Sequence, residues 1–296
     1  MPGRARACRI LLGWIEFAHM TRIETNPSLT LADTARAVLN EAQPVQKVGR
    51  VQSMARAWRD GTIAAVGTAG APDRPARPAR PELRRPGDMP KRRASGSLAN
   101  RIALLHALAH IELNAIDLAC DMLARFAPGD AAARDPLPRD FANDWLSVAD
   151  EEAKHFALLS ARLATLGCAY GDLPAHDGLW EAAGNTAHDL TARLAVVPLV
   201  LEARGLDVTP SMIANLEQAG DTESASVLRT IYGDEIGHVA IGWRWFRHVA
   251  GAQGLDPETA WPVLVREHFR GRLKPPFNET ARAAAGMQAP LYRGLA

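Results

Sequence analysis

The amino-acid sequence predicts an all-α protein built on a four-helix bundle, with additional short helices and an extended linker ahead of the bundle. Three observations lead to this prediction. Four long segments carry apolar residues at helical spacing. No segment of any length alternates apolar and polar residues as a half-buried strand does. The joints between the long segments are short or moderate, which favours a bundle.

Two short helices are expected over residues 29–60. The first follows Ser28 and Thr30, which are both suitable N-cap residues, and the second begins at Pro44, a residue favoured in a first helical turn. Residues 61–95 contain prolines every few positions, so they are expected to form a linker without regular structure. The repeated Pro-Ala-Arg triplets of this linker favour an extended path.

The four long helices are expected over residues 97–126, 138–167, 179–205 and 222–250. Gly205 is taken as the end of the third helix. A short helix is then expected over residues 209–220, with Thr209 as its cap and Pro210 in its first turn. After Asp256 the sequence predicts one more short helix and an irregular tail. The predicted parts of the chain are a poorly defined segment (1–28), two short helices plus the Pro/Arg-rich linker (29–95), the bundle (96–270) and a C-terminal tail (271–296).

The sequence pattern of the first 28 residues supports neither a membrane segment nor an export signal. Their apolar stretch, residues 10–15, is short, ends at Glu16 and has no small-residue cleavage site behind it. Met20 is an equally acceptable natural start, which would make residues 1–19 extra. No run of about 18 apolar residues occurs anywhere, so no transmembrane helix is expected. The cysteines share no pairing or zinc-type spacing, which indicates reduced thiols and a cytoplasmic protein: Cys8, Cys120 and Cys168.

Charge is distributed unevenly along the chain. Residues 1–95 contain 17 Lys/Arg and 8 Asp/Glu, a net charge of +9, whereas residues 96–296 contain 17 and 25, a net charge of −8. A basic segment of this kind is typical of an arm that faces nucleic acid. It is equally typical of a segment that wraps an acidic body, and we favour this second interpretation.

Two Glu-x-x-His pairs lie within long predicted helices: Glu152/His155 and Glu235/His238. Residues three apart share one helical face, so both side chains of a pair can reach one ion. Chance alone gives roughly 0.5 such pairs in a chain with 15 Glu and 9 His, so one pair is weak evidence. A third pair, Glu16/His19, lies on no long helix and is interpreted as a chance match.

The other two long helices each carry a glutamate among apolar residues, Glu112 and Glu202. A carboxylate inside a bundle is unfavourable unless it is paired or bound to metal. Four glutamates and two histidines suit a pair of iron or manganese ions better than zinc. Ferritin-like dimetal proteins arrange their ligands in this way. The predicted ligands are Glu112, Glu152, His155, Glu202, Glu235 and His238, and the expected cofactor is two iron ions, with manganese or a mixed Mn/Fe pair as alternatives.

Residues 29–270 resemble a bacterial ferritin-like family of unassigned function that is related to the tRNA isopentenyladenosine hydroxylases. The resemblance is carried by the phrases "HIELNAIDLA", "DEEAKHF", "YGDLPAHDGLW", "VPLVLEARGLDVTP" and "IYGDEIGHV". It implies a dimetal centre more strongly than any substrate. It also implies that the acid before each ligand glutamate binds the histidine of the opposite pair, so that Asp234 would orient His155 and Glu151 would orient His238.

Other residues near the predicted ligands have candidate roles. Pro198 is expected to kink or bulge its helix just before Glu202. Tyr232, one turn before Glu235, is a candidate catalytic hydrogen-bond donor or a core residue. The facing helix contains glycines that either leave room for O₂ or substrate or permit close packing: Gly233, Gly237 and Gly242.

His106 and His110 share a helix with Glu112 but point to another side of it. We expect them to bind the connector or the N-terminal helices. The connector around Tyr170 and His176 is interpreted as a buried turn network, with a substrate-entry loop as the alternative.

The predicted function is a diiron oxidoreductase that activates O₂ to hydroxylate or oxidise an organic substrate. The chain has no flavin or nicotinamide fingerprint, so an external electron donor is required. The substrate is a small molecule or a tRNA nucleoside, and no membrane partner is expected. The alternative is a metal-binding protein without an organic substrate, with a ferroxidase, storage or structural site. A third hypothesis is an RNA-associated helical protein with a vestigial metal site. The sequence specifies no oligomeric state.

Overall fold

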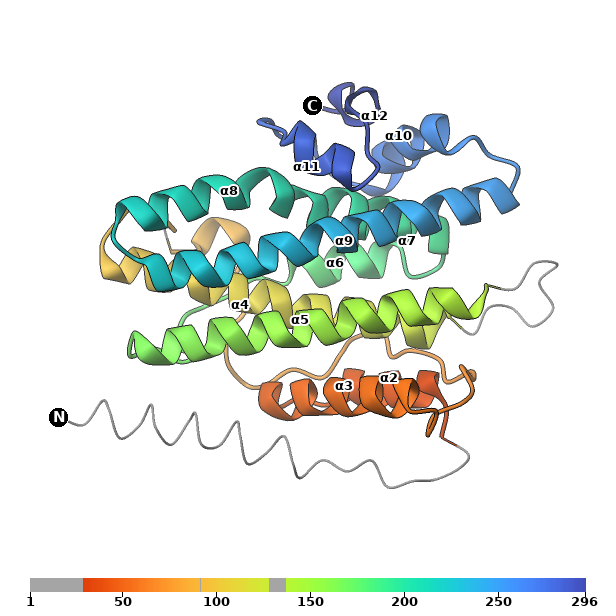
Figure 1. Ribbon diagram of the computed structural model, residues 1–296, viewed down its shortest axis with the longest axis horizontal. Helices are drawn as coiled ribbons and strands as arrows, with labels where there is room; N and C mark the ends of the chain where they lie inside the picture. Colours follow the sequence, from red (N-terminus) through yellow and green to blue (C-terminus); the bar gives the residue numbers. More distant parts are fainter. Residues whose placement is uncertain (1–28, 91, 128–136) are drawn as a thin grey trace. The chain divides into compact units, whose positions relative to one another are not determined.

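The computed structural model describes residues 29–90, 92–127 and 137–296 (Figure 1). All regular structure in these ranges is helical, apart from one isolated parallel bridge between Leu83 and Ala175. The predicted all-α class is therefore confirmed. The predictions for residues 1–28, including Met20 as a start and the Glu16/His19 pair, lie outside the described residues.

The chain divides into two compact units, one ending at Asp177 and the other spanning Gly178–Ala296. The boundary falls within the predicted bundle, and each unit contains two of the four segments in which we expected long helices. A single four-helix bundle over residues 96–270 stays a prediction.

The first unit is organised around two long neighbouring helices. Helix α4 continues directly into a π-helix, η2, and packs against α5, while α2 packs on α4 and η2, and α3 packs on α5. Thr30, one of the two N-cap residues expected from the sequence, starts α2 and forms a capping box with Asp33. The helix bounds are α2 (Leu31–Leu39), α3 (Pro44–Arg59), α4 (Leu98–Asp121), η2 (Met122–Phe126) and α5 (Arg139–Thr165).

The helical stretch Leu98–Phe126 is long and apolar enough to cross a membrane, although no such run was expected from the sequence. In its most apolar window 78% of the residues are buried inside the structure. The core helix of a water-soluble protein has the same length and composition, so this stretch is weak evidence for a membrane span.

The Pro/Arg-rich linker is held on the first unit by its own contacts. It contains one short turn of 3₁₀-helix, η1 (Pro86–Asp88). Arg77 and Lys47 both donate to the fully buried carboxylate of Asp117 on α4, and Arg77 also donates to the Asn114 side chain at 2.6 Å. The backbone N–H of Ala76 donates to the carbonyl of Leu39 at 2.8 Å. In the described part of the basic segment, these contacts agree with the interpretation that it wraps the protein's own body.

The second unit is organised around α9 and a helix that is interrupted in its middle. That interrupted helix consists of α7, the π-helix η3 and α8, and each of these three parts packs against α9. The bounds are α6 (Gly178–Asn185), α7 (Leu190–Val196), η3 (Val197–Glu202), α8 (Ala203–Gln218), α9 (Thr222–Ala252), α10 (Pro257–His268), α11 (Glu279–Ala284) and α12 (Ala289–Arg293).

The prediction of one helix over residues 179–205 was wrong at its beginning, because the chain breaks between α6 and α7. Asp189 caps α7 by accepting from the backbone N–H groups of Thr191 and Ala192. The buried Arg193 donates to the hydroxyl of Thr186 at 2.9 Å and to the carbonyl of Ala183 at 2.7 Å. The Asp189 cap and the hydrogen bonds of Arg193 therefore stabilise the break between α6 and α7. The spacing of apolar residues in the sequence does not indicate this break.

The predicted helix end at Gly205 and the separate helix at 209–220 were also wrong, since α8 runs unbroken through Gly205 and Pro210. Proline lacks the N–H group that would bind the carbonyl of Leu206. The side-chain amide of Asn278 donates to that carbonyl instead, at 3.1 Å. Asn278 also caps α11, which, like α12, lies in the tail that we expected to be irregular.

We predict that Asp117→Asn destabilises the protein by about 3–5 kcal/mol, because it leaves the charges of Lys47 and Arg77 without their buried counter-charge. Arg74→Gln is the matched control. Arg74 pairs with Asp177 at the surface, so its loss changes the free energy of unfolding by less than about 1 kcal/mol. Urea unfolding followed by circular dichroism measures both values. Equal effects of the two substitutions would contradict a structural role for the buried pair.

Candidate metal centre

The first unit brings three of the predicted ligands together in its interior. Glu112 lies on α4, and Glu152 and His155 lie on one face of α5. The Nδ1 atom of His155 lies 3.4 Å from a carboxylate oxygen of Glu112 and 3.4 Å from one of Glu152. All three side chains are buried, and their ligand atoms lie within 4.8 Å of one another. This cluster can hold a metal ion.

The electrostatics of the cluster favour a bound cation. Burial, followed by the negative charge of Glu152, raises the pKa of Glu112 well above its usual value. Burial alone would lower the pKa of His155, but its hydrogen bonds to Glu112 and Glu152 and their charges outweigh this effect and raise it to about 11. Without metal the cluster therefore retains a proton on the imidazole. A metal ion supplies positive charge to the same oxygen and nitrogen atoms.

The second unit contains the other three predicted ligands on two helices that pack together. Glu202 is the last residue of η3, and Glu235 and His238 lie on α9. The Nδ1 atom of His238 lies 3.6 Å from a carboxylate oxygen of Glu235. His238 is buried, whereas Glu202 and Glu235 are half-buried. Each unit therefore carries one Glu-x-x-His pair and one further glutamate on a neighbouring helix.

The helix that carries Glu202 is irregular immediately before this residue, as the position of Pro198 predicted. Residues 197–202 form a π-helix that includes Pro198. A Cβ atom added at Gly242 of α9 would come within 2.4 Å of the Pro198 side chain. Gly242 therefore permits close packing against the bulge. Gly233 and Gly237 differ, because a Cβ added at either would meet no atom of the described chain within 4 Å.

The neighbours of the ligands have different surroundings. Glu151 and Asp234, the predicted partners of the ligand histidines, are half-buried, and which histidine each one binds stays a prediction.

The hydroxyl of Tyr232 accepts a hydrogen bond from the side-chain amide of Asn278 at 2.9 Å. This contact was not expected, since Asn278 lies in the tail that was predicted to be irregular. A catalytic role for Tyr232 stays a prediction.

His106 and His110 bind the connector, as expected. The Nε2 atom of His106 accepts from the backbone N–H of Gly171 at 2.9 Å. His110 contacts the Tyr170 hydroxyl through Nδ1 at 2.9 Å and the carbonyl of His176 through Nε2 at 3.1 Å. Since a carbonyl only accepts, Nε2 of His110 carries the proton and Nδ1 accepts from the tyrosine. Tyr170 and His176 are half-buried and Asp172 is exposed, so the choice between a buried turn network and a substrate-entry loop stays a prediction.

Comparisons with known proteins identify a family but assign no activity. The model of a family described as "Protein of unknown function (DUF455)" matches residues 40–293, a range that includes all six predicted ligands. A protein of Haemophilus influenzae named "Uncharacterized protein" is 43% identical over 203 residues, which cover 68% of this chain and 69% of that protein. No solved structure matches the chain.

We predict that stability falls as the pH decreases from about 6.5 to about 4, in part because of His106. Burial, and to a smaller extent the charge of Arg92, lower the pKa of His106 to about 4, although Asp172 opposes them. The unfolded chain therefore binds a proton in this range that the folded protein does not bind. The stabilisation is complete above pH 6.5 and is lost as the pH falls towards 4, with a limit of about 3 kcal/mol.

His106→Gln tests this prediction, because the glutamine oxygen can accept from Gly171 but does not titrate. We expect the free energy of unfolding of this variant to depend less on pH than that of the wild type between pH 6.5 and 4.5. The exposed His248 provides the control His248→Gln, which should keep the wild-type slope. An unchanged slope in His106→Gln would refute the assignment.

Proposed function

Because the chain belongs to the DUF455 family, whose description assigns no activity, we propose from the site itself that the protein is a dimetal-carboxylate oxidoreductase. The observation that supports this most directly is the buried cluster of Glu112, Glu152 and His155. In the proposal, these residues and their counterparts in the second unit, Glu202, Glu235 and His238, complete one ferritin-like dimetal centre. The order Glu, Glu-x-x-His, Glu, Glu-x-x-His along the chain is the arrangement known for such centres.

The residues fit a pair of iron ions. Carboxylate oxygens and imidazole nitrogens suit iron or manganese, and no cysteine belongs to the cluster. The described cysteines, Cys120 and Cys168, are both free thiols, which is compatible with a reducing compartment. When bound, a reduced centre of this donor set supplies dioxygen activation for the hydroxylation or oxidation of an organic substrate.

The protein's own residues would hold and tune such a centre. His155 and His238 bind as neutral imidazoles, so metal loading releases the proton that the cluster of Glu112 and Glu152 stabilises on His155. Glu151 and Asp234 would fix the orientation of the ligand histidines. Since hydroxylation by O₂ places one oxygen atom in the product and one in water, two electrons must come from an external donor.

A tRNA nucleoside remains one candidate substrate, and a small metabolite is the other. The tRNA candidate depends on the resemblance to tRNA hydroxylases. The positive charge of the linker supports binding of tRNA only weakly. Its side chains Arg74 and Arg77 already pair with Asp177 and Asp117 of the same unit.

We predict that anaerobically purified protein binds about two Fe or Mn ions per chain, one for each set of ligands. Glu152→Ala and Glu235→Ala should each abolish loading of the pair, whereas the exposed Glu258→Ala should load normally. Elemental analysis and iron absorption spectra after reconstitution measure the result. Absence of metal from reconstituted wild-type protein would rule out the centre, and full loading of both ligand variants would show that other residues bind it.

We predict that a deletion strain accumulates one organic substrate, and that wild-type protein but not Glu152→Ala restores its consumption. Mass spectrometry of tRNA nucleosides and of small metabolites identifies the class of that substrate. A changed nucleoside supports the tRNA candidate, and an unchanged nucleoside profile removes it. If neither profile changes while iron storage or tolerance does, the alternative of a ferroxidase or storage protein replaces the oxidoreductase.

A further inference from the structure

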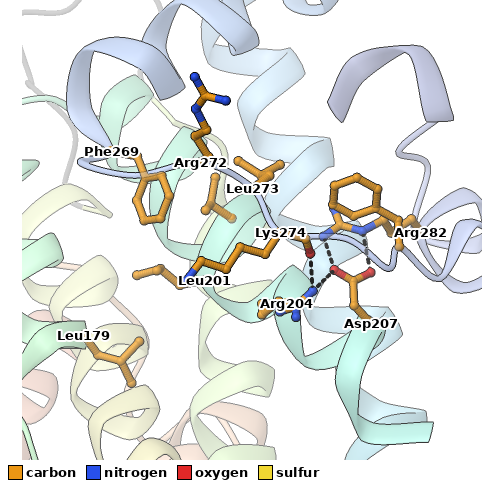
Figure 2. A pocket seen from close by; sticks show the side chains of 11 residues that line it. Leu179, Leu201, Arg204, Asp207, Phe269, Arg272, Leu273, Lys274 and Arg282 are labelled. Atoms are coloured by element: carbon orange, nitrogen blue, oxygen red, sulfur yellow. Dashed lines mark hydrogen bonds and ion pairs between the residues drawn. The ribbon is translucent and has the colours of Figure 1, made fainter. Parts of the chain in front are cut away.

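The second unit contains a cavity of about 270 Å³ on the helix that carries Glu202 (Figure 2). One wall is formed by Val200 and Leu201 of η3, and another by Leu179 of α6. A third wall is the segment 269–277, which we call the strap and which contributes Phe269, Leu273 and Phe277 among others. The cavity therefore lies within one unit, and most of its named wall residues are apolar.

The strap is fixed in place by hydrogen bonds of its backbone. Arg204 donates to the carbonyls of Lys274 and Pro276, the second at 3.3 Å. The backbone N–H of Leu273 donates to the carbonyl of Leu295 at 3.1 Å. These bonds give the cavity a preformed shape, which reduces the ordering that a ligand must impose.

A buried ion pair holds the chain that follows the strap. The carboxylate of Asp207 on α8 accepts two hydrogen bonds from the guanidinium of Arg282, at 2.8 and 2.7 Å. It also accepts from the backbone N–H of Asn278 at 2.9 Å. Asp207 is the only carboxylate among the residues that line the cavity, and its pairing with Arg282 neutralises its charge. The cavity has no acidic group to repel an anion.

Two cations at the cavity remain available for a ligand. Lys274 and Arg272 are exposed, and neither side chain has an ion pair with any residue in the described part of the chain. Figure 2 shows the Lys274 side chain lying across the cavity towards Leu201, whereas Arg272 points away from it. Arg204, by contrast, is engaged by the strap carbonyls. Lys274 is therefore the cation placed to meet a bound molecule.

We propose that this cavity binds a small amphipathic anion, with an apolar body between η3 and the strap and a carboxylate paired with Lys274. The size of the cavity lies just below the usual range for small-molecule sites, about 300–1,000 Å³, so the ligand is small. An apolar body gains from burial against leucine and phenylalanine side chains. The inference goes beyond the proposed metal function and does not depend on it, because no metal ligand contributes to the binding.

The experiment compares octanoate with 1-octanol, which has the same apolar chain without the charge. Isothermal titration calorimetry of the full-length, metal-free protein should show octanoate binding about tenfold more tightly, since a charge-assisted contact of roughly 1.4 kcal/mol gives this ratio. Lys274→Gln should remove the preference and leave 1-octanol binding unchanged. Arg270→Gln is the matched control, because Arg270 is exposed on the same segment but does not line the cavity.

A second variant locates the binding. Leu179→Trp fills the cavity from the α6 side and should abolish binding of both probes, while circular dichroism confirms that the variant is folded. Absence of octanoate binding to the wild type would overturn the proposal. Equal affinity for the two probes, or an undiminished preference in Lys274→Gln, would overturn the assigned role of the lysine and of the anion.

Discussion

The unfavourable burial of carboxylates among apolar helices is the constraint on which both units depend. A buried carboxylate requires a positive partner, and two of the four buried acids described above have a lysine or an arginine. Asp117 is neutralised by Lys47 and Arg77, and Asp207 by Arg282. The contacts of Glu112 are different in kind, since they are with His155 and with the second acid Glu152. This difference separates the acids that stabilise the fold from the acids that suit a metal.

A related constraint, the need of buried backbone carbonyls for a hydrogen-bond donor, links the irregular helices to the C-terminal segments. Two prolines, Pro198 and Pro210, each remove an N–H group from the interrupted helix of the second unit. Side chains from the C-terminal part of the chain donate to carbonyls in this region: Asn278 to Leu206, and the indole of Trp261 to Ala195 at 3.0 Å. The tail therefore stabilises the helix that carries Glu202, so truncating it affects more than the surface.

The sequence was sufficient to predict the helical class, most long helices and a plausible ligand set, because these depend on local spacing. Apolar residues at helical spacing marked α4, α5 and α9, and Glu-x-x-His placed Glu152 and His155 on one face. The failures arose where a distant side chain completes the local structure. Gly205 and Pro210 predicted a helix end because local sequence patterns do not show the distant donor to the Leu206 carbonyl. That donor is the side-chain amide of Asn278, about 70 residues later. The pairing of Lys47 with Asp117 is equally non-local.

The wrapping of the basic segment has a consequence for the order in which the protein folds. Lys47 is separated from Asp117 by 70 residues, and Arg74 is separated from Asp177 by 103. During synthesis the arginines and prolines leave the ribosome well before the α4 and α5 surfaces on which they dock. Closing loops of this length is entropically unfavourable, and it can occur only after the long helices have paired. The described linker is thus made before the helices on which it docks but is fixed after them, and its positive charge keeps it hydrated until then.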